Sequence, residues 1–392
     1  MRVPHPHDGF IAVNVAYRLR RQTTASLRPH RATLKPDMSD APDILFSALK
    51  RILEARETLS REEARNLLGE ILDRMQRPDP DPTWLFQQQT RIAALLGALA
   101  ARGETTAELA GFVDAFRAKA TPMPLSDAER SVLVDTCGTG GDLSGTFNIS
   151  TAAALVAAAA GARVAKHGNR AVTSKSGSAD VLEALGIPVN LSPEAASEAL
   201  RTHNFAFLHA PSHQPAMKAI MPIRRALGVR TAFNILGPMS NPAGAPAQVM
   251  GVYAEYLVPV VANTLATLNT RHAFVVHGGG MDEFSISGPT TTAEVRNSEV
   301  IFRTVTPADF GLTTAPIETL AGDTVQTNAA ILRAIFAGEK GPRRDVVVMN
   351  AAAVLITANL AENFLDAARL AECTIDSNKV TQLVASMSQV GE

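Results

Sequence analysis

The stretch best suited to chemistry is DTCGTGGDLSGTFNIST, residues 135–151, a glycine-rich polar loop behind the apolar run VLV. Glycine tolerates positive φ and lets the backbone approach a ligand without a Cβ clash. Successive N–H groups in such a loop bind anions, and a helix starting at NIST would point its positive end there. A plain turn before a helix is the alternative. The strand–loop–helix context favours phosphate or diphosphate binding, although the loop is neither a Walker loop nor a GxGxxG fingerprint.

A second candidate loop is KHGNRAVTSKSGSADVLEALG, residues 166–186. Lys166, Arg170 and Lys175 concentrate positive charge there, and Ser176–Ser178 resemble a second anion loop. A single lysine is more often a solvated surface charge. Cations clustered with glycine and serine at the end of a strand favour contact with phosphate instead.

Two further motifs are ambiguous by themselves. Asp282 and Glu283 follow a glycine loop in VVHGGGMDEFS, where they could diverge toward Mg²⁺ ions or form a solvated acidic turn. Arg224, Arg225 and Arg230 precede the turn-rich GPMSNPAG; a guanidinium suits a carboxylate, but a surface helix face is the simpler explanation. On residue types alone, the solvated alternative is favoured for both motifs.

The composition limits the class of protein. The 392 residues, 46% of them hydrophobic, suffice for two domains or one large one. A net charge of -1 argues against a nucleic-acid-binding protein, so an anionic ligand must meet a local site. Two cysteines, Cys137 and Cys373, fit a reducing cytoplasm better than a disulfide framework. No apolar run reaches about 18 residues, so no membrane span is expected.

The order of elements predicts the fold class. Residues 39 to about 120 show helical periodicity, with Ser60 and Glu63 spaced for a capping box and Gly103 placed as a C-cap. Strands and helices then alternate, which favours a mostly parallel sheet with its ligand site at the carboxyl ends of the strands. The expected strands are SVLVD, ARVAKH, FAFLH, AQVMGVY, HAFVVH and the start of DVVVMNAAAVLITA, which continues as a helix.

The first 37 residues form a separate basic segment, with seven Arg and Lys against two Asp. It could be a disordered arm, a targeting-like segment, or the product of a start codon placed too early, with Met38 as the true start. A secretory signal is disfavoured because no apolar core leads to a small-residue cleavage site. A disordered arm or an early start is the favoured interpretation.

Taken together, DTCGTGGD, TFNIST, KHGNR with SGSADVLEALG, RRALGVRTAFNILGPMSNPAG and VHGGGMDEFS resemble the anthranilate phosphoribosyltransferase family, in the family's order. The resemblance runs from about residue 39 to the C-terminus. It implies an α/β fold: a small all-helical domain plus a larger α/β domain whose mostly parallel central sheet is flanked by helices. The implied limits are 38–108 for the helical domain, completed by about 210–230, and 109–392 for the catalytic domain. It also implies a cytoplasmic homodimer joined through the helical domain.

The implied reaction transfers the phosphoribosyl group of 5-phosphoribosyl-1-diphosphate (PRPP) to the amine of anthranilate, in tryptophan biosynthesis. The resemblance implies no acid or base residue, but transition-state positioning by Lys166, Asp282 and Glu283. It implies two Mg²⁺ ions per monomer, held by Ser150, Asp282 and Glu283. The implied anthranilate residues are Gly138, His167, Asn169 and Arg224. The implied PRPP residues are Gly138, Thr139, Gly141, Asp142, Thr146, Asn148, Ser150, Thr151, Lys166 and Ser178.

The sequence departs from the family's pattern in two places. Gln214 stands before PAMK where the family usually has His, with His213 one place earlier, and Leu143–Ser144 replace a small pair after GTGGD. A bulky Leu143 has to point away from the diphosphate. The rival functions are a pyrimidine nucleoside phosphorylase, which needs no Mg²⁺ carboxylates, and a non-catalytic nucleic-acid-binding homologue, which needs a basic face. The acidic pair and the near-zero net charge count against them. Partners are therefore expected to be PRPP, anthranilate and a second copy, without nucleic acid or membrane.

Overall fold

The computed structural model describes residues 43–171 and 175–388. The predictions for residues 1–37 and for a start at Met38 lie outside these residues. The strands are β1 (Leu133–Gly138), β2 (Arg163–Gly168), β3 (Phe205–His209), β4 (Ala247–Gly251), β5 (His272–Gly278), β6 (Thr290–Arg296) and β7 (Glu299–Val305). The helices are α1 (Ile44–Lys50), α2 (Arg61–Met75), α3 (Pro82–Arg102), α4 (Thr106–Lys119), α5 (Asp127–Ser131), α6 (Ile149–Ala159), α7 (Ser178–Ala184), α8 (Pro193–His203), α9 (Ala210–His213), α10 (Met217–Leu227), α11 (Ala232–Met239), α12 (Leu257–Thr267), α13 (Val325–Phe336), α14 (Pro342–Thr357), α15 (Phe364–Asp376) and α16 (Lys379–Ser388), with short turns at Arg51–Ala55, Pro307–Phe310 and Ile317–Leu320.

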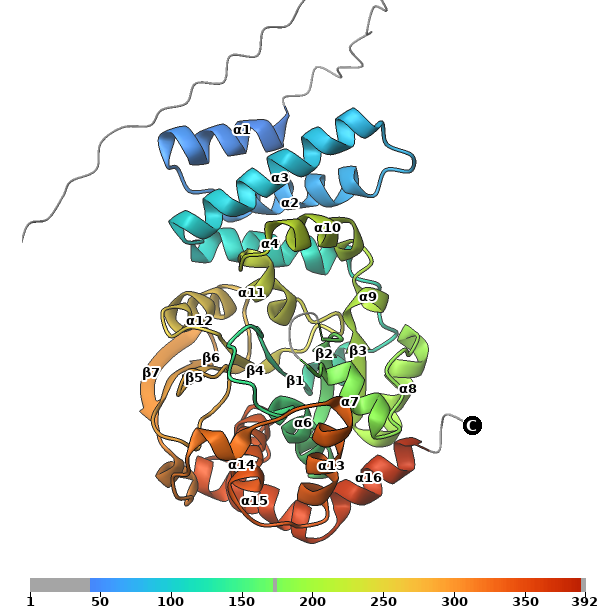
Figure 1. Cartoon of the computed structure of the whole chain (residues 1–392), viewed down its shortest axis with the longest axis vertical. Helices are drawn as coiled ribbons and strands as arrows, with labels where there is room; N and C mark the ends of the chain where they lie inside the picture. The colour runs from blue at the N-terminus through green and yellow to red at the C-terminus, as the bar shows by residue number, and fades with distance from the viewer. Residues whose placement is uncertain (1–42, 172–174, 389–392) are drawn as a thin grey trace, which may run out of the picture. The chain divides into compact units, whose positions relative to one another are not determined.

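Helices α1 to α4 form a bundle (Figure 1), and its apolar core continues through α10, α11 and α12 to one face of the sheet. The predicted capping box at the start of α2 is confirmed: the Ser60 side chain accepts from the Glu63 N–H, and Glu63 accepts from the Ser60 N–H. Gly103 caps α3, as the sequence predicts. Gly111 allows α4 to approach α2 closely, because a Cβ there would lie 2.2 Å from the carbonyl oxygen of Arg61. Helices α10 and α11 come from the middle of the sequence and pack against this bundle.

The seven strands of the described residues form one sheet in the order β3-β2-β1-β4-β5-β6-β7. The first five strands run parallel, as the alternation of strands and helices predicts. Strands β6 and β7 pair antiparallel at one edge and form a hairpin that was not among the expected strands. The predicted fold class, a helical domain plus an α/β domain with a mostly parallel sheet, is confirmed.

One predicted strand is wrong. Residues 345–357, DVVVMNAAAVLIT, belong entirely to α14. A run of valines favours a strand, but nearly every side chain of this segment is buried, and a continuous apolar run cannot distinguish a buried helix from a buried strand. Helix α14 packs against the alanine-rich α6 and contacts β1, β4 and β5 (Figure 1), so its apolar residues cover the central strands.

The strands carry their polar loops at one edge of the sheet. The glycine loop follows β1, the lysine–serine loop follows β2, and the Asp282–Glu283 turn follows β5. The parallel arrangement therefore brings these three polar segments to the same edge.

Within residues 43–171 and 175–388, no helix has the length and apolar character needed to cross a bilayer.

Candidate functional site at the carboxyl ends of the strands

The glycine loop between β1 and α6 has the backbone geometry that the sequence predicts. Gly140 and Gly141 adopt φ of +67° and +77°, which non-glycine residues rarely take. Gly138 is needed for a different reason, since a Cβ there would lie 2.2 Å from Oδ2 of Asp282. The Gly140 N–H donates to the same Oδ2 atom at 2.7 Å. The loop and the acidic turn, 142 residues apart in the sequence, are therefore in direct contact.

Lys166 is the buried cation of this site. It lies on β2 with 1% of its surface exposed, and its Nζ donates to the Thr136 carbonyl at 2.6 Å and to Ser150 Oγ at 3.3 Å. Burial lowers the pKa of Lys166, and neighbouring acids that include Asp135, Glu283 and Asp282 oppose that shift. An ammonium held among carboxylates at a loop edge is suited to contact an anionic group of a ligand.

The carboxylates at this edge of the sheet accept few hydrogen bonds. Glu283 accepts one backbone N–H, from Ser150 at 3.1 Å, and Asp282 accepts the Gly140 N–H. Burial raises the pKa of Asp282, with the charge of Asp142 as the next cause. Burial also raises the pKa of Glu283, with the charge of Asp282 next. Asp282 is buried, and Glu283 and Asp142 are partly buried. Acids that repel one another in such a position favour a bound cation.

These acids fit Mg²⁺ in particular. Among the described residues, no three His, Cys, Asp or Glu side chains are grouped to hold a metal by themselves. Mg²⁺ does not require such a cage, because it takes one or two carboxylates and fills its octahedron with water and substrate phosphates. The carboxylate oxygens of Asp282 and Glu283 accept few hydrogen bonds from the protein, so they are suited to this mode of binding.

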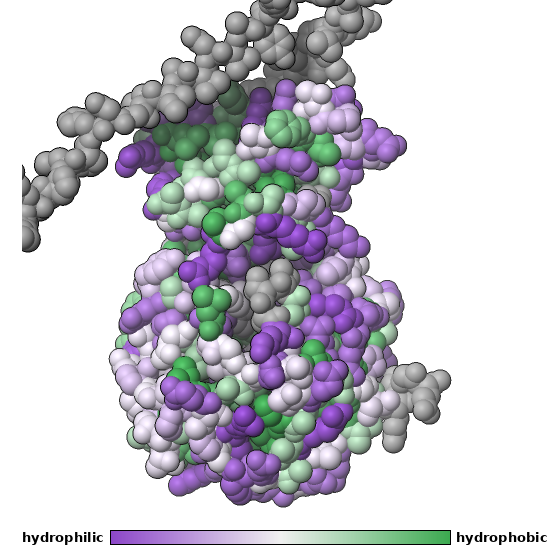
Figure 2. Space-filling model, viewed as in Figure 1, coloured by the Kyte–Doolittle hydropathy of each residue, from purple (hydrophilic) through white to green (hydrophobic). Residues whose placement is uncertain are grey.

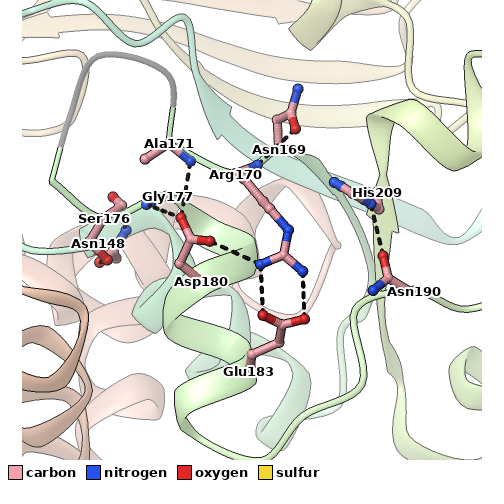
Figure 3. Close-up of polar contacts among 10 residues, drawn as sticks. All are labelled: Asn148, Asn169, Arg170, Ala171, Ser176, Gly177, Asp180, Glu183, Asn190 and His209. Atoms are coloured by element: carbon pink, nitrogen blue, oxygen red, sulfur yellow. Dashed lines mark hydrogen bonds and ion pairs between the residues drawn. The ribbon is translucent and has the colours of Figure 1, made fainter.

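The lysine–serine loop is joined to the glycine loop by side chains. Asn148 Nδ2 donates to the carbonyl of Ser176, and Thr151 Oγ1 donates to Ser178 Oγ. Asp180 accepts from the N–H groups of Ala171 and Gly177, both at 3.0 Å, and so holds the two ends of the loop together (Figure 3). Four of the predicted PRPP residues, Asn148, Thr151, Ser178 and Lys166, therefore lie along two adjoining segments.

The free positive charge that the sequence suggested at Arg170 is not available. Its guanidinium makes two hydrogen bonds to Glu183, at 2.7 and 2.6 Å, and a third to Asp180 at 3.0 Å (Figure 3). Lys175 likewise pairs with Asp323. Lys166 is the one of the three suggested cations whose ammonium reaches the glycine-loop side, through Ser150. Spacing along the chain could not reveal this, since the acids of α7 meet Arg170 only after the helix forms.

The predicted anthranilate residues lie around the end of β2 and on α10. His167 is 6% exposed; its Nδ1 faces the Gly237 carbonyl at 3.1 Å, and its Nε2 has no hydrogen-bond partner among the described residues. Burial lowers the pKa of His167 to about 4, so the ring is neutral near pH 7. Asn169 accepts the Arg170 N–H through Oδ1. Arg224 lies with its guanidinium 5.6 Å from the Phe233 ring, and no acid among the described residues forms an ion pair with it.

The remaining predicted residues lie on the glycine loop itself. Thr139 accepts the Tyr253 N–H through Oγ1 and donates its own N–H to the Gly251 carbonyl. Gly141 accepts from Arg230, Asp142 accepts the Ser144 N–H, and Thr146 pairs through its hydroxyl with Ser144. The structure thus brings the predicted PRPP and metal residues to one edge of the sheet.

Arg230 is a loop contact that the sequence analysis assigned only to a helix surface. It lies beyond the end of α10, donates through Nη1 to the Gly141 carbonyl at 3.0 Å, and stacks 4.5 Å from the Tyr253 ring. Its nearness to GPMSNPAG gave no indication of this contact. Arg230 therefore links the glycine loop to the segment that joins α10 and α11.

The two departures from the family's pattern have different settings. Leu143 is 88% exposed and adopts φ of +61°, so it keeps the conformation of a glycine and points into solvent. Gln214 is 2% exposed and donates through Nε2 to the Ser240 carbonyl. Within the part of the chain that the structure describes, neither ring nitrogen of the neighbouring His213 has a hydrogen-bond partner. Leu143 therefore does not occupy the site, whereas the change at 214 is internal.

Comparison with known proteins gives a consistent result. Residues 130–380 match the family described as glycosyl transferase family, a/b domain, and residues 46–120 match its helical bundle domain. A protein of Pelotomaculum thermopropionicum named anthranilate phosphoribosyltransferase is 47% identical over 85% of this chain and 93% of its own length. One of the same name from Haloferax volcanii is 49% identical over 74% of this chain and 87% of its own length.

Solved structures of similar proteins share the fold. The crystal structure of anthranilate phosphoribosyltransferase from Thermus thermophilus has a TM-score of 0.80 and 38% identity, covering 88% of this chain and 98% of that chain. The Saccharomyces cerevisiae enzyme in complex with PRPP and Mg also has a TM-score of 0.80, at 27% identity, covering 89% of this chain and 99% of that chain.

Proposed function

The chain belongs to the anthranilate phosphoribosyltransferase family, and from that membership we propose that its site transfers the 5-phosphoribosyl group of PRPP to the amine of anthranilate. The products are N-(5-phosphoribosyl)anthranilate and diphosphate, the reaction depends on Mg²⁺, and it belongs to tryptophan biosynthesis. This proposal rests on one observation. The glycine loop, the buried Lys166 and the acids Asp282 and Glu283, which accept few hydrogen bonds from the protein, lie together at one edge of the sheet.

The PRPP side of the site consists of the two anion loops. The Thr139 and Gly140 N–H groups of the glycine loop donate to Gly251 and Asp282, so we assign phosphate contacts to the loop beyond them and to the start of α6. Lys166 presents a buried ammonium. The Asn148 side chain does not cap helix α6, and the Ser150 N–H in its first turn donates to Glu283. The positive end of the helix still favours phosphate oxygens beside it. The side chains that we assign to PRPP are Thr139, Asp142, Thr146, Asn148, Ser150, Thr151, Lys166 and Ser178, together with the backbone of Gly138 and Gly141.

Mg²⁺ supplies positive charge that neutralises the departing diphosphate. We assign it to Asp282, Glu283 and Ser150, and propose two ions per monomer because the two carboxylates accept from different backbone groups. Equilibrium dialysis of Mg²⁺ in the presence of PRPP measures this number. A single ion at saturation contradicts the second site.

The chemistry requires positioning more than proton transfer. Cleavage at the anomeric carbon develops oxocarbenium-like charge, as in glycoside hydrolysis. An aromatic amine is a nucleophile without a strong base, so the residues act by holding the two reactants in line and stabilising the leaving group. We assign to Lys166 the positive charge that faces the leaving diphosphate. Asp282 and Glu283, on the acidic turn, would position the diphosphate through the Mg²⁺ that they hold.

The anthranilate side is formed by Gly138, His167, Asn169 and Arg224. The neutral ring of His167 and the guanidinium of Arg224, which has no acid partner among the described residues, are suited to an aromatic acid. We expect Arg224→Ala to raise KM for anthranilate about 10-fold to 100-fold while PRPP binding changes little, because a charge-assisted bond to a carboxylate is worth about 1.5–3 kcal/mol. Equal damage to both substrates contradicts the carboxylate role.

The helical bundle also offers a surface for self-association. Phe46, Leu53 and Phe86 are 53%, 55% and 68% exposed, and Figure 2 shows hydrophobic surface over the bundle. Exposed apolar clusters of this kind commonly mark protein interfaces, and we propose a homodimer through them. Light scattering of wild type and of a Phe46→Ser/Phe86→Ser double variant tests this; a monomeric wild type contradicts it. From this biosynthetic role we also propose a cytoplasmic location.

The deciding experiment is the loss of anthranilate fluorescence on incubation with PRPP and the protein. We expect consumption that requires Mg²⁺ and stops with a chelator. The same preparation is tested for phosphorolysis of uridine and thymidine. Nucleoside cleavage without loss of anthranilate signal assigns the protein to the rival phosphorylase function.

A further inference from the structure

Strands β1 and β2 separate where the site begins. Both have six residues, yet their Cα register pairs only Leu133 with Arg163 and Val134 with Val164. The ladders on either side continue: β1 pairs with β4 as far as Gly138–Gly251, and β2 pairs with β3 as far as Gly168–His209. The gap is therefore confined to the space between β1 and β2, and it starts at Asp135.

Buried backbone groups in such a gap need other partners. Three side chains provide them. Asp135 Oδ1 accepts the His167 N–H at 3.1 Å, and Lys166 Nζ donates to the Thr136 carbonyl at 2.6 Å. Asn241 Nδ2 donates to the Ala165 carbonyl at 2.7 Å. Side chains thus replace the ladder hydrogen bonds that the diverging strands do not make.

Asp135 and Asn241 also bond to each other. Asn241 Nδ2 donates to Asp135 Oδ2 at 2.8 Å, and its own Oδ1 accepts the Ala243 N–H at 2.8 Å. Asp135 is 1% exposed and Asn241 is 6% exposed, so neither has access to bulk water. The amide of Asn241 thus uses its nitrogen as a donor twice and its oxygen as an acceptor, which makes its orientation well determined.

The Asp135–Asn241 pair contacts the backbone beside Lys166 and His167. We assign Lys166 to the PRPP side of the site and His167 to the anthranilate side. The N–H that Asp135 accepts belongs to the peptide between Lys166 and His167. Neighbouring residues of a strand point to opposite faces, and here Lys166 reaches Ser150 while His167 faces the Gly237 carbonyl. Fixing that one peptide therefore fixes both side chains. Asp135 also places a negative charge behind the buried ammonium of Lys166, and each affects the other's pKa.

We propose that Asp135 and Asn241 are a positioning pair for the transfer reaction, which holds β1 and β2 apart at a set distance and thereby aligns Lys166 with PRPP and His167 with anthranilate. Neither residue touches a substrate, and the proposal rests on the proposed function. Because small misplacements of reacting groups cost about 100-fold in rate, the pair acts on catalysis through the two residues it holds.

The test is a donor–acceptor exchange. In Asp135→Asn, the new amide keeps an acceptor for the His167 N–H but opposes its own NH₂ to that of Asn241, and it removes the charge behind Lys166. In Asn241→Asp, two carboxylates face each other and the Ala165 carbonyl loses its donor. The double variant D135N/N241D restores one donor facing one acceptor and one negative charge in the pair.

We expect each folded single variant to lose about 10-fold to 100-fold in kcat, with KM for PRPP and for anthranilate both raised. The double variant should regain about 10-fold over the poorer single variant, as contacting residues couple strongly in such cycles. A merely structural role predicts loss in proportion to lowered thermal stability, without this recovery. Glu108→Gln, a buried acid of the helical bundle, serves as the destabilised control and should keep the wild-type kcat.

Several outcomes overturn the pair. A folded Asp135→Asn variant with wild-type kcat and both KM values unchanged does so, and so does a double variant no better than its singles. If a single variant does not fold, the double variant carries the test: folded and active supports the pair, and inactive or unfolded contradicts it. A wild-type protein that consumes no anthranilate instead contradicts the proposed function, so the two failures are distinguishable.

Discussion

The helical bundle and the sheet edge both bury carboxylates, but they treat them in opposite ways. Glu108 in α4 is fully buried and accepts from Arg102, from the N–H and hydroxyl of Thr105, and from the N–H of Leu59. At the sheet edge, Asp282 accepts the Gly140 N–H and Glu283 accepts the Ser150 N–H, while each stands near other acids.

The pKa values follow this difference. Burial raises the pKa of Glu108, but the Arg102 guanidinium and the two backbone N–H donors outweigh burial and hold it below the ordinary value. Burial raises the pKa of Asp282 and Glu283, and neighbouring acids add to the rise. A buried acid whose oxygens all accept hydrogen bonds and that has a cationic partner stabilises the fold. A group of acids without such partners costs stability but can bind a ligand.

The strongest challenge to this comparison is to neutralise the acids of the sheet edge. We expect Asp282→Asn and Glu283→Gln each to lower kcat about 100-fold to 1000-fold, the size of effect of removing one group that stabilises a transition state. The ligand-free variants should melt at or above the wild-type temperature, because a repulsive charge has gone. Steady-state kinetics and thermal unfolding measure the two effects. Lower kcat together with a marked fall in melting temperature would mean that these acids are structural.

The reverse pattern is expected at Glu108. Glu108→Gln leaves the partly buried Arg102 without its buried anion, which should reduce the free energy of unfolding by about 3 kcal/mol. The kcat of the folded protein should remain within about 2-fold of wild type, because Glu108 lies in the bundle, away from the sheet edge. Urea unfolding gives the first quantity, and Glu62→Gln, an exposed acid of α2, is the matched control with less than about 0.5 kcal/mol of change. An equal loss in both variants would remove the distinction.

The pH dependence of that difference sharpens the comparison. Because the folded pKa of Glu108 lies below its ordinary value of 4.5, its contribution is fully present above pH 4.5 and is lost as the pH falls through the folded pKa. The stability gap between wild type and Glu108→Gln should therefore narrow as the pH is lowered from 7 to below the ordinary pKa of 4.5. Urea titrations at several pH values measure the gap. A gap that widens toward acid pH contradicts a lowered pKa.

The smallest expected effect concerns Leu143 on the glycine loop. A non-glycine residue at φ of +61° costs about 1–2 kcal/mol, while glycine costs about 0.5–1 kcal/mol more chain entropy, so Leu143→Gly should stabilise the protein by at most about 1 kcal/mol. Since the side chain is 88% exposed, kcat should stay within about 2-fold. Leu143→Ala keeps the strained φ and should show no such gain. A large loss of kcat in Leu143→Gly would place the side chain in the site.

Much of this molecule could be predicted from local sequence. The Ser60–Glu63 capping box and the Gly103 cap depend on residues within one turn of each other. The glycine loop could be predicted because positive φ at 140 and 141 is a local property that glycine alone takes readily. Alternation of strands and helices was enough for the parallel sheet, since right-handed crossovers leave few other arrangements.

The rest was decided by contacts between distant residues. The valines of α14 form a helix because burial on all sides, not periodicity, governs that segment. Arg170 loses its free charge to Asp180 and Glu183 only when α7 folds beneath it. Asp135 meets Asn241, 106 residues away, only because the strands part at residue 135. Local preference depends on neighbours in the chain, whereas the charge state and orientation of a buried group depend on whatever the tertiary fold places around it.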